Sequence, residues 1–333
     1  MIIHHFFPFP LFFLFSKFRL PLGVRSVLIK VIFCLTFLSV VSPSLAQSDS
    51  SQSNSGVSKP NKNRVLFIAG AEATLYAGSL IALNELWYKD YPRSSFHFFN
   101  DNKEWLQLDK AGHLTTSYYI GRIGISFLKW GGLERKKAIW FGGILGSVYQ
   151  STIEIMDGYS AEWGFSIGDF TANTAGSALV IAQALAWDEQ RIVLKYGFQS
   201  SPYAQYRPDL LGSNFAERLL KDYNGQTYWL SVNPSSFMSS STRFPKWLNF
   251  AIGYGANGMI GGYSNPIITD ENGNALHFDR YRQFYLSLDV DLTRIKTKSV
   301  FLKTVFTAIG FLKIPAPALE FNKYGLYARW MGF

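Results

Sequence analysis

The sequence contains little cysteine, little histidine and little charge. Among its 333 residues one is a cysteine and five are histidines, and charged residues make up 17%. Ordinary soluble domains carry about a quarter charged residues, so the chain is too apolar for a disordered protein and unusually apolar for a cytosolic one. The single cysteine, Cys34, lies in an apolar N-terminal stretch that we expect to be removed. This excludes disulfides and thiol chemistry in the mature chain.

Several signatures of enzymes and nucleic-acid-binding proteins are also missing. The chain has no phosphate-binding Walker loop. Its formal net charge of +9 comes from scattered lysines and arginines without a long basic run. Because no nucleic-acid recognition motif accompanies this charge, we expect no nucleic-acid partner. Membrane lipid is the expected partner, since a basic envelope protein can face anionic lipid.

The first 46 residues have the build of a signal peptide. Arg25 and Lys30 flank an apolar core at 31–41, and small residues precede the expected cleavage after Ala46. The residues before Cys34 are Val-Ile-Phe, which is not the small-residue box of a lipidated cysteine. We therefore expect export without lipidation. A flexible polar leader at 47–63, rich in serine and asparagine, is expected to follow.

The region 64–199 is expected to form a helical domain. Apolar segments follow one another at 65–88, 110–128, 137–156 and 170–187. Small residues recur four positions apart, as in Gly142 and Gly146, which lets helix backbones approach closely. Glu72 and Glu85 interrupt the first segment, and the loop charges invert the positive-inside rule for four spans. The sequence therefore predicts a four-helix apolar bundle that lies in or against a membrane from the periplasmic side.

The remaining residues, 200–333, are expected to be rich in β-strands. The segment 282–295 alternates, with Phe284, Leu286 and Leu288 on one face and Gln283 and Asp289 on the other. This is the pattern of a half-buried antiparallel strand, with its apolar face inward. An Asn-Gly pair at 272–273 predicts a hairpin turn, and 214–223 reads as a short amphipathic helix. The predicted fold class is α+β, with an N-terminal four-helix apolar bundle followed by a C-terminal antiparallel β region.

Three pairs of polar residues interrupt the apolar helices at spacings of three or four: Asp109 with His113, Glu154 with Asp157, and Asp169 with Asn173. This spacing places both members of a pair on one helix face. Carboxylates and a histidine that converge from neighbouring helices are how bundle proteins build metal sites. A histidine with carboxylates suits Zn, Mn or Fe, whereas carboxylates alone favour Mg or Ca. The candidate metal ligands are His113, Glu154 and Asp157.

The same cluster can carry acid–base chemistry without a metal, because Asp109 or Glu154 can poise His113. The candidate catalytic residues are His113, Asp109, Glu154, Asp157 and Asp169.

A structural interpretation stands beside the chemical one. Ser166 and Asp169 fit a capping box at the start of the fourth helix. Asn173 can hold two helices together by a hydrogen bond, and Gly176 can permit close packing. Buried charges need partners under either interpretation.

The motifs "DKAGH" and "STIEIMDGYSAEWGFSIGDFTANTAG" resemble those of the YfiM-like family of uncharacterised bacterial envelope proteins (domain of unknown function 2279). The motif order is also similar, more weakly, to that of the VanZ-like membrane proteins. In the VanZ pattern a Gln and an Arg follow the Glu, and this chain lacks them, so the resemblance does not imply VanZ activity. The positions carried over are Asp109, Lys110, His113, Glu154, Asp157, Asp169, Asn173 and Gly176.

Together these patterns predict an exported, membrane-associated cell-envelope protein with a structural or ligand-binding role. The alternative is a metal-dependent or acid–base enzyme that acts on a lipid or lipid-linked cell-wall substrate, for which a divalent metal would be the cofactor. The sequence does not distinguish the inner from the outer membrane.

Overall fold

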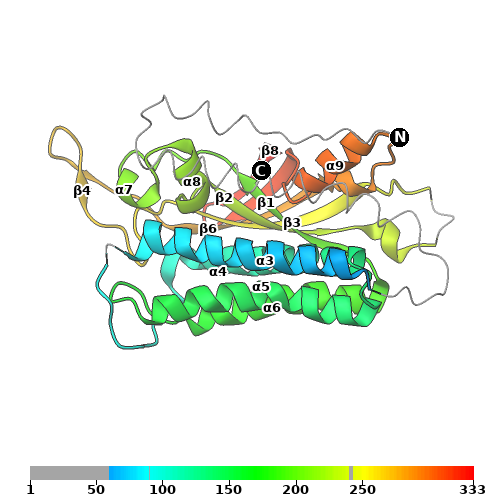
Figure 1. Cartoon of the computed structure of the whole chain (residues 1–333). Coiled ribbons are helices and arrows are strands. Elements are labelled where there is room, and N and C mark those ends of the chain that lie inside the picture. Colours follow the sequence, from blue (N-terminus) through cyan, green and yellow to red (C-terminus); the bar gives the residue numbers. More distant parts are fainter. Residues whose placement is uncertain (1–59, 90, 240–242) are drawn as a thin grey trace, which may run out of the picture.

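The computed structural model describes residues 60–89, 91–239 and 243–333. The predicted signal peptide at 1–46, with Cys34, and most of the predicted leader at 47–63 lie outside the described residues. The described chain has the predicted α+β class, with helices in the N-terminal part and an antiparallel sheet after them. Figure 1 shows the long helices as one layer beneath the sheet, with the short helices α7, α8 and α9 around the edges of the sheet.

Three long helices form the helical core: α4 (Leu108–Trp130), α5 (Arg135–Gly158) and α6 (Ile167–Trp187). Their shared core contains Tyr118, Ile139 and Val180, each fully buried. The predicted close approach is present, because a Cβ on Gly146 would lie 2.1 Å from the backbone oxygen of Ser117. The small residues therefore set the distance between α4 and α5.

The fourth expected helix is α3 (Lys62–Leu83), which continues into the π-turn η1 (Asn84–Tyr88). Only Ile68 of α3 is buried, so this helix lies beside the other three without contributing to their core. A four-helix bundle is therefore not confirmed. In the described part of the chain α3 is the one helix long and apolar enough to cross a membrane by length and composition.

The main sheet is antiparallel, in the order β1-β2-β3-β6-β7-β8. Its strands are β1 (Ile192–Phe198), β2 (Gln226–Val232), β3 (Leu248–Asn257), β6 (Tyr281–Val290), β7 (Ala316–Asn322) and β8 (Gly325–Gly332). The sheet thus begins before the predicted boundary at 200. A small hairpin, β4 (Ile268–Thr269) and β5 (Ala275–Leu276), turns at Gly273 with φ 82°, so the predicted hairpin turn is confirmed.

Short helices connect the strands: α7 (Pro208–Leu211), α8 (Phe215–Lys221), α9 (Val300–Ile309) and the 3-10 turns η3 (Pro234–Phe237) and η4 (Leu292–Arg294). A further 3-10 turn, η2 (Glu104–Gln107), directly precedes α4. Helix α8 confirms the short helix expected at 214–223. Helix α9 connects β6 to β7.

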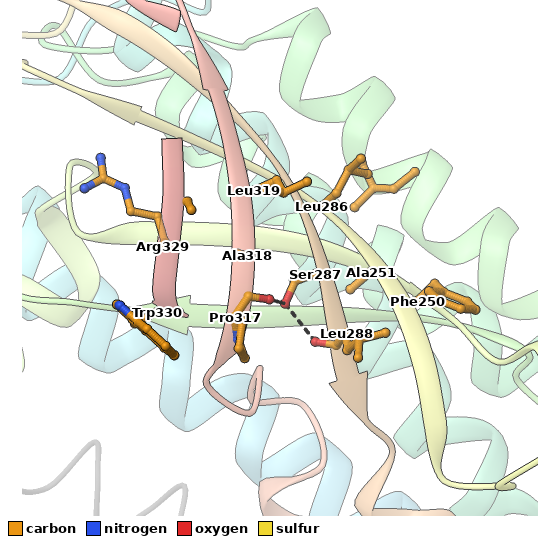
Figure 2. A pocket seen from close by; sticks show the side chains of 12 residues that line it. Phe250, Ala251, Leu286, Ser287, Leu288, Pro317, Ala318, Leu319, Arg329 and Trp330 are labelled. Carbon is orange, nitrogen blue, oxygen red and sulfur yellow. Dashed lines mark hydrogen bonds between the residues drawn. The ribbon is translucent and has the colours of Figure 1, made fainter. Parts of the chain in front are cut away.

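The polarity of the sheet is the reverse of the prediction. Asp289 and Gln283 are buried, at 1% and 6% exposure, whereas Phe284 is 50% exposed and Leu286 is 46% exposed. Alternation fixes which residues share a face but does not decide which face is covered. We call the exposed side the apolar sheet face, formed by Phe250, Ile252, Phe284, Leu286, Leu288 and Leu319. Figure 2 shows four of these side chains, Phe250, Leu286, Leu288 and Leu319.

The opposite face is covered because the sheet curls over it. Residues 311–313 pair with β1 through Tyr196, and Trp229 Nε1 donates to the backbone oxygen of Phe333 at 2.9 Å. The enclosed space holds a buried ion pair between Lys195 Nζ and Asp289 Oδ2 at 2.8 Å. Ser231 Oγ donates to the same carboxylate oxygen at 2.6 Å. The charges of β1 and β6 thus neutralise each other inside the sheet.

Candidate cation site in the helical bundle

The start of α4 is held in an unusual backbone conformation. Trp105, Leu106 and Gln107 all have left-handed φ values, of 45°, 51° and 67°, which bulky residues rarely adopt. The turn is tied to the β region, because the Trp105 amide donates to the Gly262 oxygen at 2.9 Å and the Tyr254 hydroxyl donates to the Leu106 oxygen. This turn directs the first turn of α4, and with it the polar cluster, into the bundle.

Lys110 is surrounded by three carboxylates. Its Nζ lies 2.6 Å from Asp101 Oδ2, 2.8 Å from Asp109 Oδ2 and 3.1 Å from Asp169 Oδ1. All four side chains are largely buried, with exposures of 13% or less. The carboxylates of Asp101, Asp109 and Asp169 would suit a metal ion, but the Lys110 ammonium already supplies the positive charge between them.

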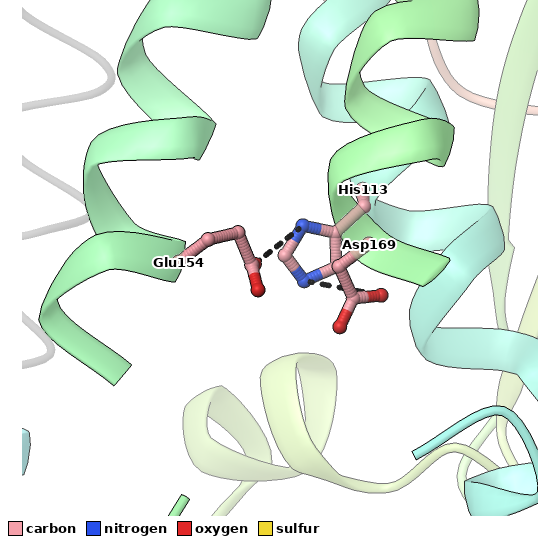
Figure 3. A group of neighbouring side chains, drawn as sticks. All are labelled: His113, Glu154 and Asp169. Carbon is pink, nitrogen blue, oxygen red and sulfur yellow. Dashed lines mark ion pairs between the residues drawn. The ribbon is translucent and has the colours of Figure 1, made fainter. Parts of the chain in front are cut away.

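His113 lies one helical turn further along α4, between α5 and α6. Its Nδ1 is 3.1 Å from Asn173 Oδ1, an acceptor, and 3.3 Å from Gln150 Nε2, a donor, so either tautomer of the neutral imidazole finds a hydrogen-bond partner at Nδ1. Nε2 faces Asp169 Oδ1 at 3.9 Å, and Nδ1 is 3.7 Å from Glu154 Oε1. Figure 3 shows the ring between the two carboxyl groups. Both distances exceed the range of a hydrogen bond.

The second half of the site is fixed by the start of α6. Ser166 caps this helix, accepting from the Asp169 amide at 3.0 Å, as its predicted role requires. The Ser166 amide donates to Glu154 Oε2 at 3.3 Å, and its hydroxyl donates to Asp101 Oδ1 at 2.6 Å. One capping residue therefore positions carboxylates from α5, from α6 and from the loop before α4.

Burial controls the protonation of the cluster. Burial, reinforced by nearby carboxyl groups, raises the pKa of Glu154 to about 9. Burial likewise raises the pKa of Asp169 to about 8, with Lys110 opposing the shift, and raises the pKa of Asp109. Burial shifts the pKa of the imidazole in the opposite direction, because its protonated form is the charged one, and lowers the pKa of His113 to about 4. At neutral pH the histidine is therefore neutral, while Glu154 and Asp169 hold protons that a bound cation can replace.

Asp101 behaves differently from its neighbours. Burial opposes its ionisation, but hydrogen bonds from Asp169, Lys110 and Ser166 outweigh burial and lower its pKa. Asp101 is therefore the charged partner of Lys110, and Asp169 the protonated one.

Several buried polar atoms of the cluster lack a hydrogen-bond partner among the described residues: Asp109 Oδ1, Asp169 Oδ1 and Asn173 Nδ2. Leaving a buried polar group unsatisfied costs about 1–3 kcal/mol. Asp169 and Asn173 are 5% and 0% exposed. Asp169 also belongs to a set in which one His113 nitrogen and one oxygen each of Glu154 and Asp169 lie within 4.8 Å of one another.

The structure separates the predicted residues into those that converge and those that do not. His113, Asp109, Glu154, Asp169 and Asn173 lie together in the cluster. Asp157 belongs to neither possible metal group. Its Oδ1 accepts a hydrogen bond from the Tyr88 hydroxyl at 2.5 Å, and burial raises its pKa to about 6. Gly176 serves packing, because a Cβ there would lie 2.2 Å from the Leu114 oxygen.

Two residues of the cluster were not predicted. Gln150, whose Nε2 lies 3.3 Å from His113 Nδ1, is buried on α5 one turn before Glu154. A polar residue at this spacing in an apolar helix is a signal that could have found it. Asp101 stands in a loop without periodicity, and only the folded chain brings it to Lys110.

Comparison with known proteins agrees with these motifs. Residues 97–184, which contain α4, α5 and most of α6, match the family model described as "Predicted periplasmic lipoprotein (DUF2279)". The match confirms the resemblance to this family over that segment. No curated protein and no solved structure matches the chain. The similarity to VanZ-like membrane proteins stays a prediction, and Cys34 lies outside the described residues.

Proposed function

We propose that this chain is an exported, membrane-associated envelope protein whose helical bundle binds a divalent cation between His113, Glu154 and Asp169. The signal-peptide pattern and the description of the matching family as periplasmic support export. The apolar surfaces of α3 and of the sheet support membrane association.

The observation that carries the cation proposal is the arrangement of donors around His113. His113 Nε2 faces Asp169 Oδ1 at 3.9 Å, and that oxygen, which Lys110 Nζ contacts at 3.1 Å, accepts no hydrogen bond from the described residues. When Nε2 is the unprotonated nitrogen, its lone pair faces a carboxyl oxygen in a buried site, which is repulsive unless a proton or a cation lies between the two atoms. Glu154 completes a three-donor set.

The donor set favours a transition-type dication over Mg²⁺ or Ca²⁺. One imidazole nitrogen with two carboxylate oxygens suits Zn, Mn or Fe. Donors of a tetrahedral Zn²⁺ site are about 3.4 Å apart, from bond lengths of about 2.0–2.2 Å. Because the three donors already lie within 4.8 Å of one another, each donor pair would close by at most about 1.4 Å.

The test is elemental analysis and Zn²⁺ titration calorimetry of the full chain, purified in mild detergent. We expect near-stoichiometric metal in the wild type and loss of at least tenfold in affinity in the H113A and E154Q variants. His277 is an exposed histidine and Asp157 lies outside the donor set, so H277A and D157N are the matched controls and should bind like the wild type. Equal affinity in all five proteins, or no binding by the wild type, would refute the site.

A second candidate function rests on the separation of pKa values in the same cluster. Glu154, with its pKa at about 9, is a proton donor at neutral pH, and His113, with its pKa at about 4, is a neutral proton acceptor. Such divergent pairs are typical of acid–base catalysis. An enzyme acting on a lipid or lipid-linked cell-wall substrate would turn over envelope lipid extracts, detected by mass spectrometry, with E154Q inactive and D157N active. An unchanged lipid profile with metal-loaded and metal-free protein would exclude this function.

A further inference from the structure

The apolar sheet face continues a surface that the molecule itself buries. Across the sheet Leu194 pairs with Leu230, Leu230 with Ile252, and Ile252 with Leu286. Residues directly opposite in antiparallel strands share one face. Leu194 lies in the core with the bundle and is 6% exposed, whereas Ile252 is 56% exposed. The bundle therefore covers this face at β1 and leaves it uncovered from β3 onward.

From this uncovered surface we infer that the apolar sheet face, together with α9, is the docking surface for a bilayer of anionic lipid. The inference rests on the membrane association proposed above and names the surface that makes it. The face contains an open groove of about 650 Å³ between β3, β6, β7 and β8, lined by Leu286, Leu288, Leu319 and Trp330 (Figure 2). Trp330 is 89% exposed, and tryptophan is typical of a membrane interface.

Helix α9 supplies the charge that selects lipid as the occupant. It connects β6 to β7, and Leu288 near the end of β6 and Pro317 near the start of β7 line the groove. Val300 and Phe301 of α9 are 64% and 72% exposed. The segment 296–310 contains three lysines and no acidic residue. An exposed apolar helix flanked by lysines is the pattern of a segment that lies in an anionic membrane surface.

The lysines of this segment are accessible for binding to lipid headgroups. Lys296, Lys298 and Lys303 are exposed, and none forms an ion pair within the described part of the chain. A second copy of this chain would bring the same lysines to the contact, which opposes self-association. Anionic lipid complements the basic charge and solvates the apolar groove at the same time.

The test places an environment-sensitive NBD label on the face. Cys34 is replaced by serine in the full chain, and the label is attached at Ile252→Cys or, as the control, at Leu220→Cys on α8. Both side chains are 56% exposed, so they differ in location and not in accessibility. The protein is mixed with vesicles of phosphatidylcholine and phosphatidylglycerol in equal amounts. We expect a blue shift and quenching by acyl-brominated lipid at position 252 and neither at position 220.

The outcomes separate this inference from the proposal on which it rests. Vesicle-bound protein whose label at 252 stays in water would overturn the docking surface and leave membrane association intact. Protein that does not float with vesicles at all would refute both. A blue shift without vesicles would also overturn the inference, indicating a second copy if the shift depends on protein concentration and another segment of this chain if it does not.

The charge of the docking surface is tested separately with K296E/K298E. A lysine near an anionic surface contributes about a fivefold gain in partitioning, so the double variant should lose at least roughly 25-fold in binding to these vesicles. The K103E/K136E variant changes the net charge equally at exposed lysines elsewhere and should lose much less. Equal losses in the two variants would overturn the role of α9.

Discussion

Replacing Lys110 by methionine removes the ammonium from the three-carboxylate cluster while keeping the length and apolar stem of the side chain. Asp101 and Asp109, at 2.6 Å and 2.8 Å from Nζ, would then lack their counter-ion in a site that is 13% exposed or less. Removing one partner of a buried ion pair costs about 3–5 kcal/mol. In a domain of this size that corresponds to a fall in Tm of roughly 10 °C. Thermal unfolding followed by circular dichroism in mild detergent measures the change.

The same helix provides a matched control. Lys129 Nζ lies 2.7 Å from Asp188 Oδ1, but the two side chains are 31% and 52% exposed. An exposed pair contributes less than about 1 kcal/mol, so K129M should change Tm by only a few degrees. If K110M lowers Tm no more than K129M does, the buried cluster does not depend on Lys110 and the reasoning fails.

The K110M variant also tests whether lysine takes the place of a metal ion. Asp101, Asp109 and Asp169 keep oxygen donors within 4.8 Å of one another, and carboxylates alone favour Ca²⁺ or Mg²⁺. Calcium at 100 times its Kd would restore about 2.7 kcal/mol to K110M, whereas the wild type, whose cluster holds its own cation, should gain far less. Equal stabilisation of the two proteins by calcium would contradict this interpretation.

Two further predictions concern the packing of the bundle and the interior of the sheet. The G146A variant should destabilise the fold by about 1–3 kcal/mol, because the added Cβ would overlap the Ser117 backbone. The G78A variant adds a Cβ with no atom within 4 Å and should stabilise α3 by up to about 1 kcal/mol. Equal shifts in Tm, or shifts of the opposite sign, would refute the close approach of α4 and α5. Burial lowers the pKa of Lys313 to about 8. The unfolded chain therefore holds this proton to higher pH than the folded one does, so stability should rise between pH 8 and pH 9.5, towards a limit of about 3 kcal/mol. The rise should disappear in K313M, and a pH dependence that persists in this variant would assign it to another group.

The helices could be predicted because their signals are local. Apolar periodicity located α4, α5 and α6 to within a few residues, and the Ser166 cap was readable from the sequence. The separate position of α3 was not predicted, because apolar composition does not reveal whether a helix covers its neighbours or faces outward. The position of Asp101 depends on the left-handed turn at 105–107, for which the sequence offers no glycine as a signal.

The polarity of the sheet shows a different limit. Alternation in β6 correctly divided Leu286 from Asp289, but which side is enclosed depends on partners distant in sequence. Asp289 is neutralised by Lys195, and Trp229 reaches the backbone of Phe333. A charged residue enters a folded interior only with such a partner, and a single strand does not contain one. Lys195 and Asp289 therefore determine together that the polar side of the sheet is enclosed. The apolar side chains of the same strands then face outward, and a partner from outside this chain has to cover them.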